Sequence, residues 1–133
     1  LLKRIITSFI VICLLGTAAV AFASYSTYNV TLRPTKLDVT LKQGQKTTGY
    51  NNVLHKDIKL GGEYDALDVW IDRKVGSSDW SRVSDNVTCY QGGGPYTVYS
   101  DYDLKTGESI RVRGQNHDWT PVNVSAHGSI DLR

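Results

Sequence analysis

The chain has 133 residues, with 15 Lys and Arg residues against 13 Asp and Glu residues. This length is typical of one domain and excludes a multidomain enzyme. A hydrophobic content of 41% and a charged content of 21% exclude a disordered or low-complexity chain.

The first segment, residues 1–23, has the pattern of a secretory signal peptide. Lys3 and Arg4 form a short basic region, an almost entirely apolar run follows them, and Ala-Phe-Ala ends the segment at Ala23. Signal peptidase recognises this combination of a basic start, an apolar helical run and a small-x-small site. We therefore expect cleavage after Ala23 and a secreted domain over residues 24–133 with no stable membrane span. The alternative is a retained N-terminal anchor, because the apolar run approaches the length that crosses a bilayer.

Cleavage after Ala23 changes the charge of the domain. Residues 24–133 hold 13 basic and 13 acidic residues, so no net basic charge favours nucleic acid or anionic lipid as a partner. They also hold one cysteine, Cys89, which excludes a disulfide within the domain. Cys89 shares its inward register with Val87, and this predicts a buried, unreactive thiol. The alternative is a disulfide between two chains.

Alternation of apolar and polar residues recurs along the domain, and no long window has helical periodicity. Turn sequences that contain Gly or Pro separate the alternating runs. Each run predicts a half-buried strand, with one face toward a core and one toward water. The predicted strands lie at residues 27–32, 36–42, 67–72, 86–90, 109–113, 121–126 and 130–132.

About seven or eight short strands at this spacing are typical of an antiparallel β-sandwich or a small barrel. Two segments do not fit the pattern. Residues 50–59 lack clean alternation, so we expect a loop or an edge strand there. Asp85 falls on the side that Val83 and Val87 would bury, which predicts a bulge or bend. Without a repeat or a linker, residues 24–133 are predicted to form a single β-sandwich domain.

Four aromatic residues fall on the outward registers of the predicted strands: Trp70, Tyr90, Tyr99 and Trp119. Large aromatic side chains on a wet face are costly unless they contact something. Flat aromatic faces beside hydrogen-bonding groups suit sugar rings and extended peptides. The four residues are therefore candidate ligand-binding residues. The alternative is that loops cover them, because a domain without Phe needs its Trp and Tyr for packing.

Acidic residues offer a second candidate site. Asp101, Asp103 and Glu108 have part of the spacing of a calcium loop but fail the EF-hand pattern. We expect a solvated loop here, and a weak Ca²⁺ site is the alternative. Asp68 and Asp72 lie on the wet face of one predicted strand and are also expected to be solvated.

The histidines suggest neither a metal site nor a catalytic pair. His55, His117 and His127 have no spacing typical of metal ligands. His117 and Asp118 are neighbours on a strand, so their side chains point to opposite faces. A Cys89–His nucleophile would need an exposed thiol, which the register of Cys89 argues against. We expect no catalytic residue, no other metal site and no cofactor.

Two segments of the C-terminal half, residues 107–114 and 122–128, carry a resemblance to a known group of proteins. Their sequences are Gly-Glu-Ser-Ile-Arg-Val-Arg-Gly and Val-Asn-Val-Ser-Ala-His-Gly. In plan and style the chain resembles small secreted all-β proteins of Gram-positive, Bacillus-type bacteria. The resemblance implies an exported β domain without a disulfide, and it brings no catalytic residues with it.

These features favour an exported, non-enzymatic binding or interaction module. Its partner would be a cell-wall polysaccharide or an extracellular protein. A small secreted toxin or bacteriocin-like protein is the alternative, although a neutral domain argues against a cationic membrane-active peptide. A third hypothesis is a small hydrolase that uses Asp101 and Asp103.

Overall fold

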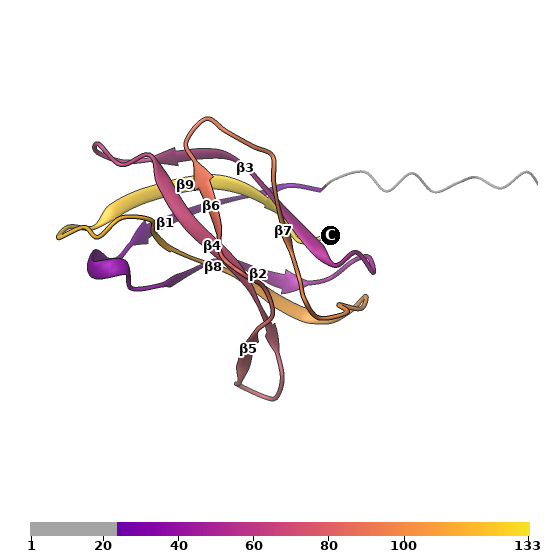
Figure 1. Ribbon diagram of the computed structural model, residues 1–133. Helices are drawn as coiled ribbons and strands as arrows, with labels where there is room; N and C mark the ends of the chain where they lie inside the picture. Colours follow the sequence, from indigo (N-terminus) through magenta and orange to yellow (C-terminus); the bar gives the residue numbers. More distant parts are fainter. Residues whose placement is uncertain (1–23) are drawn as a thin grey trace, which may run out of the picture.

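The computed structural model describes residues 24–133, and the signal peptide and helix expected over residues 1–23 lie outside the described residues. Nine strands and one short 3-10 helix follow one another in this part of the chain (Figure 1). No helix in the described part is long and apolar enough to cross a membrane. The elements are β1 (Ser26–Leu32), η2 (Pro34–Lys36), β2 (Val39–Gln45), β3 (Asn52–Leu60), β4 (Ala66–Lys74), β5 (Trp80–Arg82), β6 (Val87–Tyr90), β7 (Tyr96–Tyr99), β8 (Ser109–Asn116) and β9 (Val124–Asp131).

The strands form two antiparallel sheets. The first sheet has the order β1-β9-β3-β7. The second has the order β2-β8-β4-β5, and β6 also pairs with β4. The predicted all-β antiparallel architecture is therefore confirmed, and of the two forms expected, a sandwich or a small barrel, the two sheets correspond to the sandwich. The described residues hold nine strands, where about seven or eight were expected. The runs predicted at residues 121–126 and 130–132 belong to one strand, β9, which continues through Gly128.

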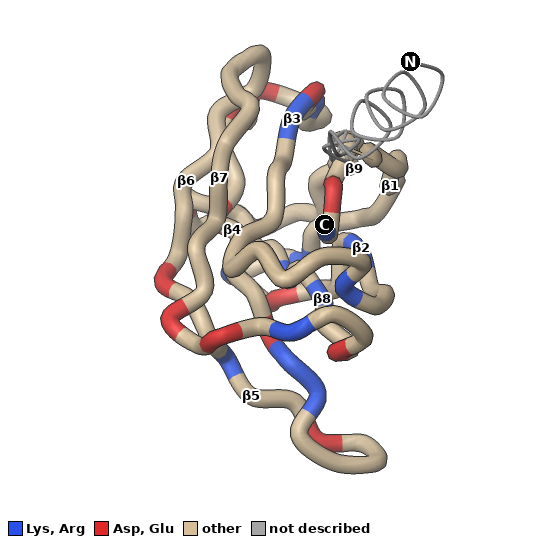
Figure 2. The backbone as a smooth tube through the Cα atoms, turned by 90° about the vertical axis from the view of Figure 1, so that its right-hand side faces the viewer, with Lys and Arg blue, Asp and Glu red and all other residues tan. Residues whose placement is uncertain are grey.

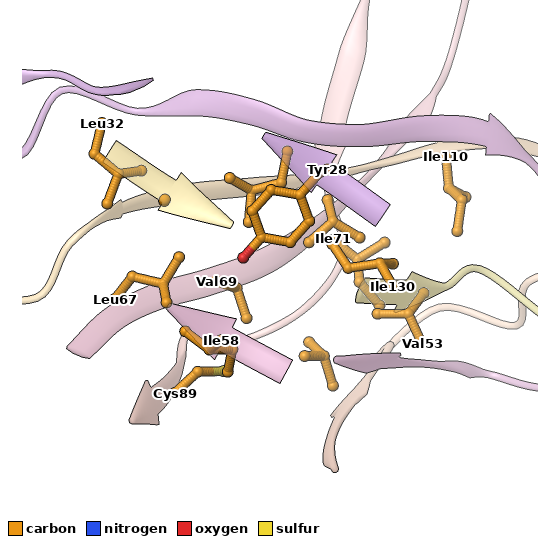
Figure 3. Packing of buried hydrophobic residues seen from close by; sticks show 14 of the residues in the cluster. Tyr28, Leu32, Val53, Ile58, Leu67, Val69, Ile71, Cys89, Ile110 and Ile130 are labelled. Carbon is orange, nitrogen blue, oxygen red and sulfur yellow. The ribbon is translucent and has the colours of Figure 1, made fainter. Parts of the chain in front are cut away.

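Alternation explains why the sheets pack together. Along β8 every second residue is buried and the residues between are half-exposed. The buried side chains of both sheets form one core cluster, in which the labelled residues point toward one another (Figure 3). Each such aliphatic side chain contributes about 1.5–3 kcal/mol when fully buried. The fully buried aliphatic residues include Leu32, Val53, Leu67, Val69, Ile71, Val98, Ile110, Val112 and Ile130.

The expectation of a loop or edge strand at residues 50–59 is wrong. β3 is an interior strand, paired with β7 on one side and β9 on the other. Its alternation is hidden by a bulge, where the pairing register shifts between Lys56 and Lys59. Asp57 has a φ of 55° at this point, in the left-handed region that bulges commonly use. The buried residues of β3 are Val53, His55, Ile58 and Leu60.

The interruption predicted at Asp85 is present. β5 ends at Arg82 and β6 begins at Val87, so two short strands share one edge of β4. Ser84 holds the bend between them, because its hydroxyl accepts a hydrogen bond from the backbone N–H of Ile71 at 2.8 Å.

Candidate functional site

The structure separates the four candidate aromatic residues. Tyr90, Tyr99 and Trp119 are exposed, at 51%, 67% and 65%. Trp70 is only 7% exposed, so the expectation that it offers a ring to a ligand is wrong. Only the first three remain candidates.

Long side chains from neighbouring strands cover Trp70. The guanidinium of Arg82 lies over its ring, 4.7 Å from the centroid, and Arg113 is its partner in β8. Arg113 also pairs with Asp38, and Arg111 pairs with Asp72 at 2.9 Å between Nε and Oδ2. Acidic and basic positions are therefore interspersed in this sheet rather than gathered into one-sign patches (Figure 2).

Of the three exposed candidates, Tyr90 is the one whose ring lies beside a histidine. It lies opposite Ala66 in the pairing of β6 with β4. On the other side of Ala66, the backbone N–H of His117 donates to the Ala66 carbonyl at 3.4 Å. The rings of Tyr90 and His117 thus flank a small residue, with centroids 6.5 Å apart and planes inclined by 59°. Both rings lie at the same end of the second sheet.

A buried carboxylate orients the His117 ring. Asp68, 7% exposed, places Oδ1 2.8 Å from Nδ1 of His117. The same oxygen accepts a hydrogen bond from the Thr88 hydroxyl at 2.8 Å. A proton on Nδ1 donates to Asp68, which leaves Nε2 of the neutral ring as an acceptor for a ligand. The Thr88 hydroxyl is bound to Asp68 rather than to Nε2, so these residues do not form a nucleophilic triad.

Trp119 follows His117 by two residues, in the loop between β8 and β9. The next residue, Thr120, is fully buried. Its hydroxyl accepts a hydrogen bond from Asn116 at 3.3 Å, and its carbonyl accepts one from the Thr35 N–H at 2.9 Å. The loop is therefore anchored beside an exposed indole. Asp68, Thr88, Tyr90 and His117, which are linked by the contacts above, and Trp119, which follows His117 by two residues in the chain, are referred to below as the Tyr90 surface.

Tyr99 lies elsewhere. It is the last residue of β7 and pairs with Asn52 at the start of β3. Tyr90, by contrast, ends β6 next to β4. Tyr99 therefore does not extend the Tyr90 surface.

Cys89 and His55 do meet, but in the core. Nδ1 of His55 lies 3.4 Å from Sγ of Cys89, and Nε2 lies 2.8 Å from the Tyr28 hydroxyl. Cys89 and His55 are fully buried, which confirms the predicted burial of the thiol. Burial lowers the pKa of His55 to about 4. Burial, reinforced by the charge of Asp68, raises the pKa of Cys89 to about 12. A neutral imidazole beside a protonated thiol is not a nucleophilic pair, because the thiolate is the reactive form.

The three acidic candidates do not form a calcium site. Glu108 accepts hydrogen bonds from Arg73 at 3.1 Å and from the Lys105 N–H at 2.8 Å. Asp103 accepts one from the Asn51 amide at 3.4 Å. Within residues 24–133 no three His, Cys, Asp or Glu side chains converge on a position for a metal ion. The described residues therefore give no support to the alternative of a weak Ca²⁺ site, and Arg73 and the Asn51 amide already engage Glu108 and Asp103.

The two largest of the hollows described here lie outside the Tyr90 surface and are shallow. One, of about 460 Å³, opens on the first sheet and is lined mainly by polar residues, among them Asp57 and His127. The other, of about 540 Å³, is lined by Asp101, Arg82 and Tyr102 among others. The first hollow could not be predicted from the alternation, because the bulge at Asp57 that helps to form it leaves no mark in that pattern.

No protein-family model matches the chain, and no curated protein matches it. A search of solved structures finds the crystal structure of a mitogen from Yersinia pseudotuberculosis, with a TM-score of 0.54. The match covers 84% of this chain and 88% of the mitogen chain, at 17% sequence identity. At this identity the likeness concerns the fold, and no residue role is transferred.

Proposed function

We propose that the protein is an exported, non-enzymatic binding module and that the Tyr90 surface holds its ligand. The observation that carries the proposal is the pairing of exposed rings with an oriented hydrogen-bonding group. Tyr90 and Trp119 are exposed at 51% and 65%. Oδ1 of Asp68 lies 2.8 Å from Nδ1 of His117 and fixes this ring, which lies beside Tyr90. Exposed aromatic faces with a convergent polar group are typical of ligand sites.

A cell-wall polysaccharide is the ligand class that suits this chemistry best. Sugar rings present apolar C–H faces to aromatic rings and hydroxyl groups to acceptors such as Nε2 of His117. The interspersed charges of the second sheet offer no one-sign field for a highly charged partner. The protonated Cys89 thiol and the Thr88 hydroxyl bound to Asp68 support binding rather than nucleophilic chemistry.

A small exported toxin is the second candidate. The observation in its favour is the fold, since the similar structure is that of a bacterial mitogen and the match covers most of both chains. In this case the Tyr90 surface would contact a protein on another cell. Added protein would then change the growth or proliferation of the target cells, whereas a wall-binding module would leave them unchanged.

Retention on insoluble polysaccharides and isolated cell walls tests the first proposal. We expect wild type to be retained, and Tyr90→Ala and Trp119→Ala to lose most of the retention. Tyr99→Ala is the matched control, because it removes a ring that is at least as exposed, at another place on the fold. Retention that Tyr99→Ala abolishes but Tyr90→Ala preserves would contradict the proposed surface. Absence of wild-type retention on every matrix would contradict the polysaccharide ligand.

A further inference from the structure

Asp131, the last residue of β9, is a buried carboxylate that contacts the first residue the structure describes. Asp131 is 2% exposed, and its Oδ2 accepts a hydrogen bond from the backbone N–H of Ser24 at 2.9 Å. Its Oδ1 accepts one from the backbone N–H of Arg133, also at 2.9 Å. The antiparallel pairing that begins at Ser26 and Ile130 brings the start of β1 to the end of β9. Ser24 is therefore placed by the sheet itself.

Several charged groups surround this contact. The Arg133 guanidinium lies 3.6 Å from Oδ2 of Asp131. Lys46 is 2% exposed and directs its ammonium to two carbonyls, those of Leu132 at 3.0 Å and Asn52 at 3.2 Å, rather than to Asp131.

Tyr25, next to Ser24, also faces Asp131, and burial and this carboxylate raise the pKa of its hydroxyl. On β3, Lys56 lies over the Tyr25 ring at 4.2 Å, and the charge of Asp57 also acts on the hydroxyl. Among these groups, the Ser24 nitrogen is the one that donates a hydrogen bond to Oδ2 of Asp131, at 2.9 Å. A hollow of about 170 Å³, lined in part by Ser24, Asp131 and Arg133, leaves space beside it.

We propose that Asp131 is the docking site for the N-terminal ammonium group that cleavage after Ala23 creates. In that hydrolysis water adds across the Ala23–Ser24 peptide bond, the C–N bond breaks, Ala23 keeps a carboxylate, and the Ser24 nitrogen becomes an ammonium. The neutral N–H donor on Oδ2 is replaced by a charged donor at the same position. Hydrogen bonds of this charge-assisted kind are about twice as strong as neutral ones. Removal of the signal peptide thereby strengthens the contact between Ser24, just before β1, and Asp131 at the end of β9.

The identity of the first residue determines whether the N-terminal ammonium reaches Asp131. A chain that begins at Ser24 places its ammonium on Asp131. A chain that begins one residue earlier keeps a neutral amide at Ser24 and carries its charge about 3.8 Å farther along the backbone. Docking of the N-terminus on Asp131 does not depend on the Tyr90 surface, so a failure of polysaccharide binding would leave this proposal intact.

Residues 24–133 contain both sheets and the whole described core, so this part of the chain serves as the test protein. Chains that begin at Ser24 and at Ala23 are compared by thermal unfolding, each with Asp131 and with Asp131→Asn. We expect the Ser24 chain to melt on the order of 4 °C higher than the Ala23 chain. We expect the difference to vanish in the Asp131→Asn pair. Equal melting temperatures, or a difference that Asp131→Asn leaves unchanged, would overturn the proposal.

A second measurement does not need the Asp131→Asn variant to fold. The pKa of the N-terminal amine is obtained from the pH dependence of its acylation rate, followed by mass spectrometry. In the Ser24 chain we expect this pKa to lie at least about one unit above the usual 7.7–8.0 of an α-amino group, because a carboxylate contacts it. In the Ala23 chain we expect the usual value. The same usual value in both chains would overturn the proposal, as would an exported protein that begins at a residue other than Ser24.

Discussion

Acidification is expected to destabilise the fold through His55. This side chain is fully buried between Tyr28 and Cys89, and burial lowers its pKa from the ordinary 6.5 to about 4. Between these two pH values the unfolded chain binds a proton at His55 and the folded chain does not. The stability that the neutral ring contributes is therefore fully present above about pH 6.5 and falls as the pH drops toward 4.

The size of the effect follows from the two pKa values. A tenfold difference in proton affinity is worth about 1.4 kcal/mol, so the loss between pH 6.5 and 4 amounts to about 3 kcal/mol. Asp38 acts at a lower pH. Hydrogen bonds and charge from Arg113 outweigh its partial burial and lower its pKa below 3.8, so its contribution is lost only at still lower pH.

Urea unfolding followed by circular dichroism at several pH values measures this free energy. His55→Gln keeps an acceptor for the Tyr28 hydroxyl and removes the titrating ring, so it should abolish most of the slope between pH 6.5 and 4. His127→Gln is the matched control, because His127 is exposed and its loss should leave the slope unchanged. A wild-type free energy that stays constant over this range, or a slope that His55→Gln preserves, would contradict this role of His55.

Three further predictions concern the core and the covered face. Gly128→Ala should destabilise the fold by about 1–3 kcal/mol, because its Cβ would lie 2.6 Å from the Tyr28 hydroxyl oxygen; an unchanged urea midpoint would contradict this. Arg82→Ala should increase the quenching of tryptophan fluorescence by iodide, because the guanidinium covers Trp70; identical quenching would show that other groups shield the ring. The Cys89 thiol, with a pKa of about 12, should resist a thiol reagent at neutral pH until the protein is unfolded, and rapid labelling of the native protein would argue against its burial.

The fold was largely predictable because most strands have one buried and one exposed face. The alternation at residues 109–113 and 86–90 corresponds to β8 and β6, and it also placed Cys89 in the core. β3 was not predicted as an interior strand, and the cause is physical. The bulge at Asp57 shifts the inward face by one residue, and the buried His55 interrupts the apolar pattern.

The candidate site was predictable only in part. Alternation tells which face of a strand a side chain occupies, and it placed Tyr90 on an outward face. It does not tell what else covers that face. Trp70 is buried on its outward register, and the Arg82 guanidinium from another strand lies over its ring. The partner of His117 was missed for the same reason, since Asp68 lies 49 residues away and the pairing of β4 with β8 has no signature in a single sequence.

The ligand site is located by mapping amide chemical shifts by NMR while soluble fragments of cell-wall polysaccharide are added to residues 24–133. We expect shifts around Tyr90, His117 and Trp119, with those around Tyr99 unaffected. Shifts centred instead on the hollow of the first sheet would place the ligand site on the opposite sheet and contradict the proposed Tyr90 surface.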